Sequence, residues 1–300
     1  MKELVVISGK GGTGKTSVVA AFASLAKRAI LADCDVDAAD LHLVLEPEVL
    51  QRHDFIGGKK ARIDHEQCMS CGRCQAVCRF EASSMTGPGN DLVSKTYRID
   101  PLACEGCGVC VGVCPVSAIA LESTTAGEWF VSQTRYGPMV HARLGVAADN
   151  SGKLVSTVRT AASDLAKQHG LGLVIVDGPP GIGCPVIASL TGASLAVVVT
   201  EPTLSGLHDL ERVAELTRHF GIPTLVCVNK WDINPDLTER IERQSVAMGL
   251  KVAGRLRYDG AVTAAQILKQ TVIEHSALGV SEDMTKLWAT VSAVLEVERQ

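Results

Sequence analysis

The sequence feature that most constrains this chain is a cysteine pattern that is written twice within a short segment. Eight of the 11 cysteines fall between residues 68 and 114, in two runs with the same internal spacing. A shorter repeat stands at the same offset, because Arg62-Ile63-Asp64 precedes the first run and Arg98-Ile99-Asp100 precedes the second. In a reducing compartment, clustered cysteines indicate metal binding before they indicate disulfides. The pattern therefore predicts a small duplicated unit that binds metal.

The spacing within each run resembles that of the bacterial ferredoxins, which hold 4Fe-4S clusters. Three closely spaced thiolates bind one cluster, and the fourth cysteine of the run binds the other cluster. Zinc sites normally use pairs of cysteines instead. The expected ligands are Cys68, Cys71, Cys74 and Cys114 for one cluster, and Cys104, Cys107, Cys110 and Cys78 for the other.

Apolar strands alternate with amphipathic helices over the rest of the chain. Such alternation predicts an α/β fold with a mostly parallel sheet and helices on both faces. The alternation stops in the cysteine segment, so we expect one α/β domain at residues 1–57 and 124–300, interrupted by a small α+β ferredoxin-like domain at residues 58–123. Expected strands are 4–8, 29–33, 173–177, 195–200, 224–229 and 252–256, and expected helices are 15–27, 152–169, 204–220, 235–248 and 282–298, the second of them capped by Asn150 or Ser151.

A glycine-rich loop follows the first expected strand and opens the first expected helix. Its sequence GKGGTGKT, from Gly9 to Thr16, fits a phosphate-binding loop in the context that this motif requires. Glycines let backbone N–H groups point at the phosphates, and the helix N-terminus adds positive potential. Lys15 is expected at the β- and γ-phosphates and Thr16 at Mg²⁺. The expected nucleotide contacts in this segment are Gly9, Lys10, Gly11, Gly12, Thr13, Gly14, Lys15, Thr16 and Ser17.

The additional lysine at position 10 makes this loop similar to the deviant Walker A loop of the MinD/ParA family. The resemblance covers nearly the whole chain outside the insertion and implies a P-loop ATPase that uses Mg-ATP. It also implies a homodimer that forms on ATP binding, in which Lys10 reaches the nucleotide of the second copy. By the same resemblance Asp35 orients the attacking water, Asp177 binds Mg²⁺ through water, and Gly181 senses the γ-phosphate. The catalytic residues would be Lys10, Lys15, Asp35 and Asp177.

Asn229 and Lys230 follow another apolar strand and are expected to contact the base. With Trp231 and Asp232 they also fit the NKxD pattern by which GTPases read guanine. ATPases of the resembled family place an asparagine there against adenine, so ATP is the favoured nucleotide and GTP is the alternative.

Composition argues against two classes of partner. The formal net charge of -4 gives no general attraction to nucleic acid. No apolar run reaches the roughly 18 residues of a membrane-spanning helix, and strand-like residues begin at Leu4, which leaves no room for a signal peptide. The last helix lacks the basic face by which MinD binds membranes. We therefore expect a cytoplasmic protein without membrane or nucleic-acid partners.

Three functions are compatible with an ATPase that carries iron-sulfur clusters. The leading one is an ATP-gated electron carrier, as in the nitrogenase iron protein, that acts on an unidentified redox partner. The second is a scaffold that delivers clusters to an acceptor protein, as Mrp-type ATPases do, although no cysteine follows Cys227. The third is a ParA-like switch whose clusters sense redox state. Cys184 stands where the nitrogenase iron protein has a ligand of a bridging cluster, but no cysteine lies between Cys114 and Cys184 to complete such a site.

Overall fold

The computed structural model of the chain describes residues 1–145 and 152–297. The chain divides into two compact units. The described residues of the larger unit are 1–53, 129–144 and 152–297, and those of the cysteine unit are 54–128 and 145.

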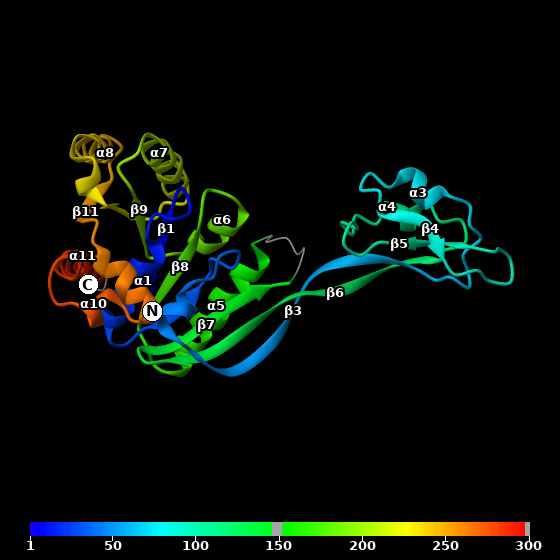
Figure 1. The fold of residues 1–300 in the computed structure, drawn as a ribbon, viewed down its shortest axis with the longest axis horizontal. Helices are drawn as coiled ribbons and strands as arrows, with labels where there is room; N and C mark the ends of the chain where they lie inside the picture. The colour runs from blue at the N-terminus through cyan, green and yellow to red at the C-terminus, as the bar shows by residue number, and fades with distance from the viewer. Residues whose placement is uncertain (146–151, 298–300) are drawn as a thin grey trace. The chain divides into compact units, whose positions relative to one another are not determined.

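The main sheet has nine strands in the order β11-β10-β9-β1-β8-β2-β7-β6-β3 (Figure 1). Every neighbouring pair from β11 to β7 is parallel. Parallel strands end at one edge of a sheet, and the register places Asp33 beside Asp177 at this edge. The strands are β1 Lys2–Ser8, β2 Ile30–Asp33, β3 Glu48–Ile63, β6 Ile119–Thr134, β7 Gly137–Leu144, β8 Leu173–Pro180, β9 Leu195–Thr200, β10 Thr224–Asn229 and β11 Lys251–Leu256.

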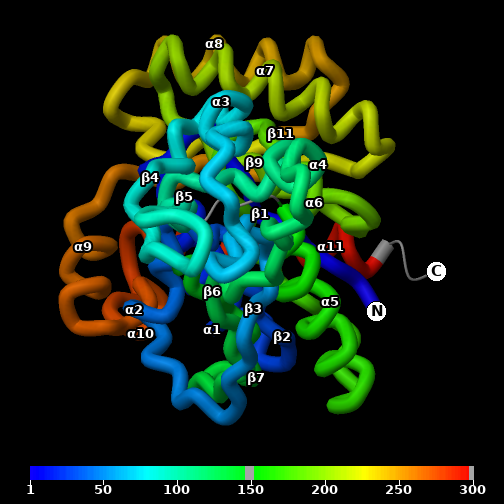
Figure 2. The backbone as a smooth tube through the Cα atoms, turned by 90° about the vertical axis from the view of Figure 1, so that its right-hand side faces the viewer, coloured from blue at the N-terminus to red at the C-terminus, as the bar shows by residue number. Residues whose placement is uncertain are grey.

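Helices cover both faces of the central strands. Leu4 and Val6 of β1 share a core cluster with Phe22 of α1, whereas Val5 and Ile7 are as fully buried and point to the opposite face. This explains why these strands are apolar at every position. Figure 2 shows α2 and α10 beside α1, in agreement with their contacts. The helices of the larger unit are α1 Lys15–Ala26, α2 Leu41–Leu45, α5 Lys153–Gln168, α6 Cys184–Leu190, α7 Leu204–His219, η1 Trp231–Ile233 (a 3-10 helix), α8 Pro235–Ala247, α9 Gly260–Ile267, α10 Val272–His275 and α11 Val280–Val297.

The cysteine unit is built from short elements. It contains parts of β3 and β6, an antiparallel pair of β4 (Ser83–Gly87) with β5 (Thr96–Ile99), and the helices α3 (Arg73–Val77) and α4 (Val109–Gly112). The sequence repeat has a structural counterpart, because Gly72 and Gly108 precede α3 and α4 with φ values of 77° and 76°. Its buried core consists of Ala61, Ile63, Cys68, Cys74, Ala82, Tyr97, Cys104 and Ile119.

Every expected strand and helix of the larger unit is present, and its ends differ from the expected ones by at most three residues. The sequence does not predict β3, β6, β7, α2, α6, η1, α9 or α10. The cysteine unit begins at Asp54 and continues to Glu128, compared with the expected insertion at residues 58–123. Asn150 and Ser151, the expected cap of α5, lie outside the described residues. Within the described ranges, no helix is long and apolar enough to cross a membrane.

Candidate functional site

The glycine-rich loop lies between β1 and α1, at the edge of the sheet where the parallel strands end. Gly14 precedes α1 with a φ of 92°. A Cβ atom at Gly14 would lie 2.4 Å from the side-chain nitrogen of Asn229, so the position requires glycine. The same nitrogen donates a 2.7 Å hydrogen bond to the carbonyl oxygen of Thr13. Asn229, at the end of β10, therefore braces the loop.

Acidic side chains face the buried lysine of the loop. Lys15 Nζ lies 3.5 Å from Oδ2 of Asp35, which follows β2. Asp177 lies within β8 and is fully buried. Burial raises the pKa values of Asp177 and Asp35, and the positive charge of Lys15 opposes that rise at both carboxyl groups. The site thus holds one buried cation among several buried acids.

The acidic oxygens suit a magnesium ion. Both carboxylate oxygens of Asp177, and Oδ1 of Asp35, are buried and have no hydrogen-bond partner among the described residues. Buried oxygens without partners are rare, and carboxylate and hydroxyl oxygens are the ligands that Mg²⁺ prefers. Thr16, in the first turn of α1, adds a hydroxyl group. These side chains fit Mg²⁺, which would satisfy the carboxylates and neutralise phosphate charge.

Lys10 points to a different group from Lys15. Its Nζ lies 2.6 Å from Oε1 of Glu201 and donates to the hydroxyl groups of Thr203 at 3.2 Å and Ser205 at 3.1 Å. Nζ of Lys230 lies 3.3 Å from the other oxygen of the same carboxylate. Sequence reasoning does not identify Glu201. The available signal is its position, because it directly follows an apolar parallel strand whose end lies at the same edge as the loop.

Two further residues that are expected to contact the nucleotide, Gly181 and Ser17, make hydrogen bonds within the chain. The backbone N–H of Gly181 donates to the carbonyl oxygen of Ser8 at 2.9 Å. The hydroxyl group of Ser17 accepts a 3.1 Å hydrogen bond from the side-chain amide of Gln266. A contact between Gly181 and a γ-phosphate would therefore require this backbone hydrogen bond to open. The predicted residues at this edge of the sheet are Gly9, Lys10, Gly11, Gly12, Thr13, Gly14, Lys15, Thr16, Ser17, Asp35, Asp177, Gly181, Asn229 and Lys230.

Residues 4–272 match the family described as CbiA: CobQ/CobB/MinD/ParA nucleotide binding domain. The chain belongs to this family. It is 34% identical over 235 residues to the uncharacterized protein MJ0578 of Methanocaldococcus jannaschii, an alignment that spans 77% of this chain and 79% of that protein. The chain is thus a MinD/ParA-type ATPase with a P-loop fold.

Solved structures of MinD share the fold. One is the septum site-determining protein MinD of Pyrococcus horikoshii with Mg-ADP, at a TM-score of 0.59 and 16% identity over 99% of this chain and 98% of that chain. Another is the cell division ATPase MinD of Pyrococcus furiosus, at a TM-score of 0.57 and 16% identity over 98% of this chain and 99% of that chain. At this level of identity the likeness shows the fold alone.

The aspartate of the NKxD-like segment has a structural partner in this MinD/ParA-family chain. Oδ1 of Asp232 accepts a 2.7 Å hydrogen bond from the backbone N–H of Tyr258. This bond links η1 to the segment after β11. Asn229 in turn uses its amide nitrogen on the loop, as described above. All three residues that define the NKxD pattern are therefore engaged within the chain, because Lys230 pairs with Glu201.

Two cavities in the cysteine unit are lined by the predicted iron-sulfur ligands. All 11 cysteines lie within the described residues, and none of them forms a disulfide. One cavity is lined by Cys68, Cys71, Cys74 and Cys114. The other is lined by Cys78, Cys104, Cys107 and Cys110, and also by Cys74. Each sequence-predicted set thus lines one cavity, and Cys74 lines both.

Hydrogen-bond donors point at some of these sulfur atoms. Sγ of Cys104 accepts from the backbone N–H groups of Gly106 at 3.4 Å and Ala61 at 3.5 Å. The hydroxyl group of Ser83 donates to Sγ of Cys74 at 3.3 Å. Burial raises the pKa of the Cys74 thiol, and the hydrogen bond from Ser83 opposes that rise.

The described residues offer no site for a single metal ion made of three or more His, Cys, Asp or Glu side chains. A 4Fe-4S cluster makes a different demand, because each thiolate binds its own iron at a separate corner of the cube. The ligands of such a cluster surround a volume and do not converge on a point. The lack of a single-ion site among the described residues therefore does not count against a cube-shaped cluster.

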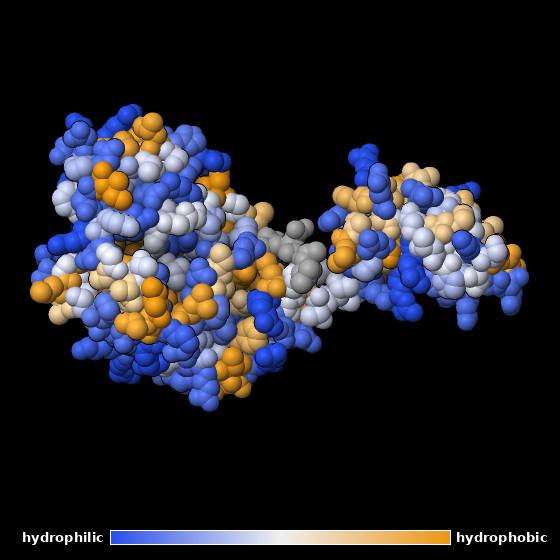
Figure 3. All heavy atoms as spheres, viewed as in Figure 1, coloured by the Kyte–Doolittle hydropathy of each residue, from blue (hydrophilic) through white to orange (hydrophobic). Residues whose placement is uncertain are grey.

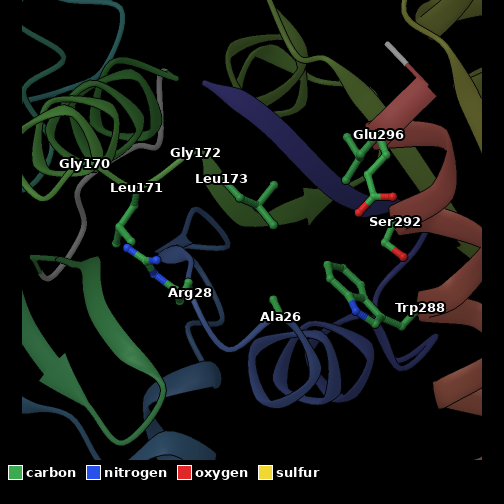
Figure 4. A pocket seen from close by; sticks show the side chains of 10 residues that line it. Ala26, Arg28, Gly170, Leu171, Gly172, Leu173, Trp288, Ser292 and Glu296 are labelled. Carbon is green, nitrogen blue, oxygen red and sulfur yellow. The ribbon is translucent and has the colours of Figure 1, made fainter. Parts of the chain in front are cut away.

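Other features of the larger unit lie apart from the nucleotide site. A hollow at the opposite edge of the sheet is lined by Arg28, Leu173, Trp288 and Glu296 among others (Figure 4). No predicted site residue lines it. Cys34 and Cys227 are buried in the core, and Cys184 is exposed at the start of α6. The larger unit thus presents one exposed thiol among its described residues, which does not suffice for a cluster.

Proposed function

We propose that this chain is an iron-sulfur ATPase in which Mg-ATP binding and hydrolysis gate electron transfer through two 4Fe-4S clusters. The observation that carries the proposal is the agreement between the two cysteine sets expected from the ferredoxin spacing and the linings of the two cavities. When bound, such clusters supply one-electron transfer. The chain's own residues would hold them, and the P-loop would respond to the nucleotide.

The exchange of the fourth cysteine is the most specific support for the clusters. Cys114, from the second run, lines the cavity of the first run. Cys78, from the first run, lines the cavity of the second. Two independent zinc sites would need no such exchange, whereas the ferredoxin arrangement requires it.

Exposed groups near the cysteines support a protein partner. Cys71 and Cys107 are exposed, and each has an exposed apolar neighbour in the sequence, Met69 at 45% and Val109 at 52% of the accessible area. Figure 3 shows further apolar side chains on the surface of this unit. Exposed apolar groups beside a redox centre favour close docking of a redox partner or cluster acceptor.

ATP is the nucleotide that the site favours. Guanine presents two adjacent donors, N1–H and the N2 amino group, to a carboxylate that reads it. One oxygen of Asp232 is already used by the backbone of Tyr258, so this aspartate is poorly placed for two-pronged recognition. The ATP-dependent homodimer is part of the same proposal and rests on family membership and on Lys10.

The test is an anaerobic purification followed by iron and sulfide analysis, EPR of the reduced protein and a redox titration. We expect about eight irons per chain, from two clusters with four each, and a potential that shifts when Mg-ATP is added. Cys107→Ser should remove about half of the iron, whereas Cys227→Ser should remove none because that thiol is buried in the core of the larger unit.

Each outcome decides a separate part of the proposal. Material without inorganic sulfide would refute the clusters. Clusters whose reduction potential does not change when Mg-ATP is added would refute gating. The scaffold and the redox sensor would then remain as the possible functions. Transfer of iron and sulfide to an apo-ferredoxin would then identify the scaffold, and a change of ATP hydrolysis on reduction would identify the sensor.

A further inference from the structure

Glu201 holds lysines from two different segments at the nucleotide edge. Its carboxylate lies 2.6 Å from Nζ of Lys10 and 3.3 Å from Nζ of Lys230. The side chain of Glu201 is 17% exposed, and each lysine side chain is 29% exposed. Burial alone would raise the pKa of Glu201, but hydrogen bonding and charge from Lys10 and Lys230 hold this pKa below its usual value. The contact is therefore an ion pair that is partly shielded from water.

The surroundings of Lys10 occupy its whole hydrogen-bonding capacity. An ammonium group has three N–H donors. The structure provides three acceptors within reach, which are Glu201, Thr203 and Ser205. Lys10 thus has no donor left for a phosphate, in contrast with Lys15, which faces the acidic side of the loop.

Lys230 extends the same contact to the loop. Its Nζ lies 3.3 Å from the carbonyl oxygen of Gly12 as well as from Glu201. The carboxylate therefore connects the loop, the end of β9 and the end of β10. Any movement of Lys10 toward a nucleotide has to break its 2.6 Å ion pair with Glu201. Lys230 then remains as the counter-ion of Glu201.

We propose that Glu201 is a positioning residue that stores Lys10 away from the phosphates until an ATP-bound dimer forms. This inference rests on the proposed ATP-dependent dimerisation. On assembly, Lys10 exchanges the carboxylate for phosphate oxygens, which carry more negative charge and are as well suited to an ammonium group. Glu201 thereby sets the concentration of chain at which dimers appear.

A static brace would behave in the opposite way. If Glu201 only held the loop in shape, its loss would weaken nucleotide binding and dimerisation together. If Glu201 competes with phosphate for Lys10, its loss favours the dimer. Glu201→Gln separates the two cases, because the amide keeps the size and one acceptor of the carboxylate but removes its charge.

The first experiment is sedimentation of wild type and Glu201→Gln with Mg-ATP. We expect the concentration at half dimerisation to fall roughly three- to fivefold in the variant, as for loss of one partly exposed ion pair. The effect should vanish when Lys10→Gln is also present, because the carboxylate then has no Lys10 to hold. Glu242→Gln is the matched control, since it removes a 2.6 Å ion pair with Arg255. Weaker dimerisation in Glu201→Gln would overturn the proposal.

The second experiment needs no nucleotide and no dimer. An amine-reactive reagent is applied to the nucleotide-free protein, and the modification of each lysine is followed by mass spectrometry. Lys10 should react roughly two- to fivefold faster in Glu201→Gln, and Lys167, which is 65% exposed, should be unchanged. Equal reactivity of Lys10 in the two proteins would overturn the proposal. A wild type that stays monomeric with Mg-ATP would refute the dimer, and the reactivity of Lys10 would still decide the role of Glu201.

Discussion

The two units of this chain differ in what fills their cores. The larger unit buries Leu, Val and Ile from several parallel strands against Phe22 and the helices on both faces. In the cysteine unit, three of the eight buried core residues are cysteines, and two others are alanines. Apolar burial contributes roughly 25 cal/mol per Å². The core of the larger unit therefore stabilises its fold more than the core of the cysteine unit does. From this difference we expect the larger unit to be stable by itself and the cysteine unit to depend on the proposed clusters.

The largest expected effect follows from removing the proposed clusters. Anaerobic chelation of iron should unfold the cysteine unit and leave the larger unit folded, because small domains without a sufficient core need a metal or disulfides. Hydrogen exchange measured by mass spectrometry should rise to that of an unfolded chain across residues 61–119 and stay unchanged in β1 and β8. Protection that persists in the cysteine unit would show that its side chains alone suffice.

Phe22→Ala tests the contribution of the core of the larger unit. Phe22 is fully buried in α1, and its ring lies 5.0 Å from that of Trp288. Its loss should destabilise the larger unit by about 3–5 kcal/mol. The three tryptophans of the chain all belong to this unit, so their fluorescence during denaturant unfolding measures it. Leu43→Ala is the control, because Leu43 is 56% exposed and its truncation should change stability by less than about 0.5 kcal/mol.

Lys15→Ala tests whether the units can be separated functionally. Loss of the buried cation at the phosphates should lower ATP hydrolysis at least about a hundredfold, with iron and sulfide content unchanged. Hydrolysis is measured as phosphate release at saturating Mg-ATP. Lys27→Ala, at the far end of α1, should behave like wild type. A variant that loses its iron as well would show that the two units do not fold independently.

A smaller effect concerns acid stability of the larger unit. Glu274 pairs with Arg135 at 2.7 Å. Burial by itself would raise the pKa of Glu274, but hydrogen bonds from Arg135 and its neighbours lower this pKa to about 2. A carboxylate whose pKa is lowered in the folded state stabilises the fold at pH values above its unfolded pKa of about 4.3. This contribution is lost as the pH falls toward 2.

Wild type should therefore lose about 1 kcal/mol more stability than Glu274→Gln between pH 5 and pH 2, a value reduced for partial exposure. Tryptophan fluorescence at each pH measures the difference. Asp164→Asn serves as control in the same unit, because Asp164 is 55% exposed and its partner Lys167 is 65% exposed, so this ion pair should contribute little. Identical pH profiles for wild type and Glu274→Gln would show that the Arg135 contact does not stabilise the unit.

The predictability of the fold follows the same division. The apolar runs of β1 and β9 can be recognised in the sequence because both faces of these strands are buried, so apolar residues follow one another without alternation. Strand β3 is mostly exposed along its length, and β6 mixes buried, half-buried and exposed positions, so neither strand carries a regular apolar period. The cysteine unit can be recognised for another reason, because the spacing of its expected ligands is local in the sequence. Its strands are short and polar, so the sequence does not reveal them.

Local sequence by itself determined the loop from Gly9 to Thr16, the two cysteine runs and the aspartates Asp35 and Asp177 beside apolar runs, because each depends on neighbours a few residues apart. Only the tertiary structure decided that Lys10 meets Glu201 and that Asp232 meets the backbone of Tyr258. The strand order of the sheet brings these partners together from segments 191 and 26 residues apart. Charge pairing over such separations has no local pattern, so it emerges only once the parallel strands are packed side by side.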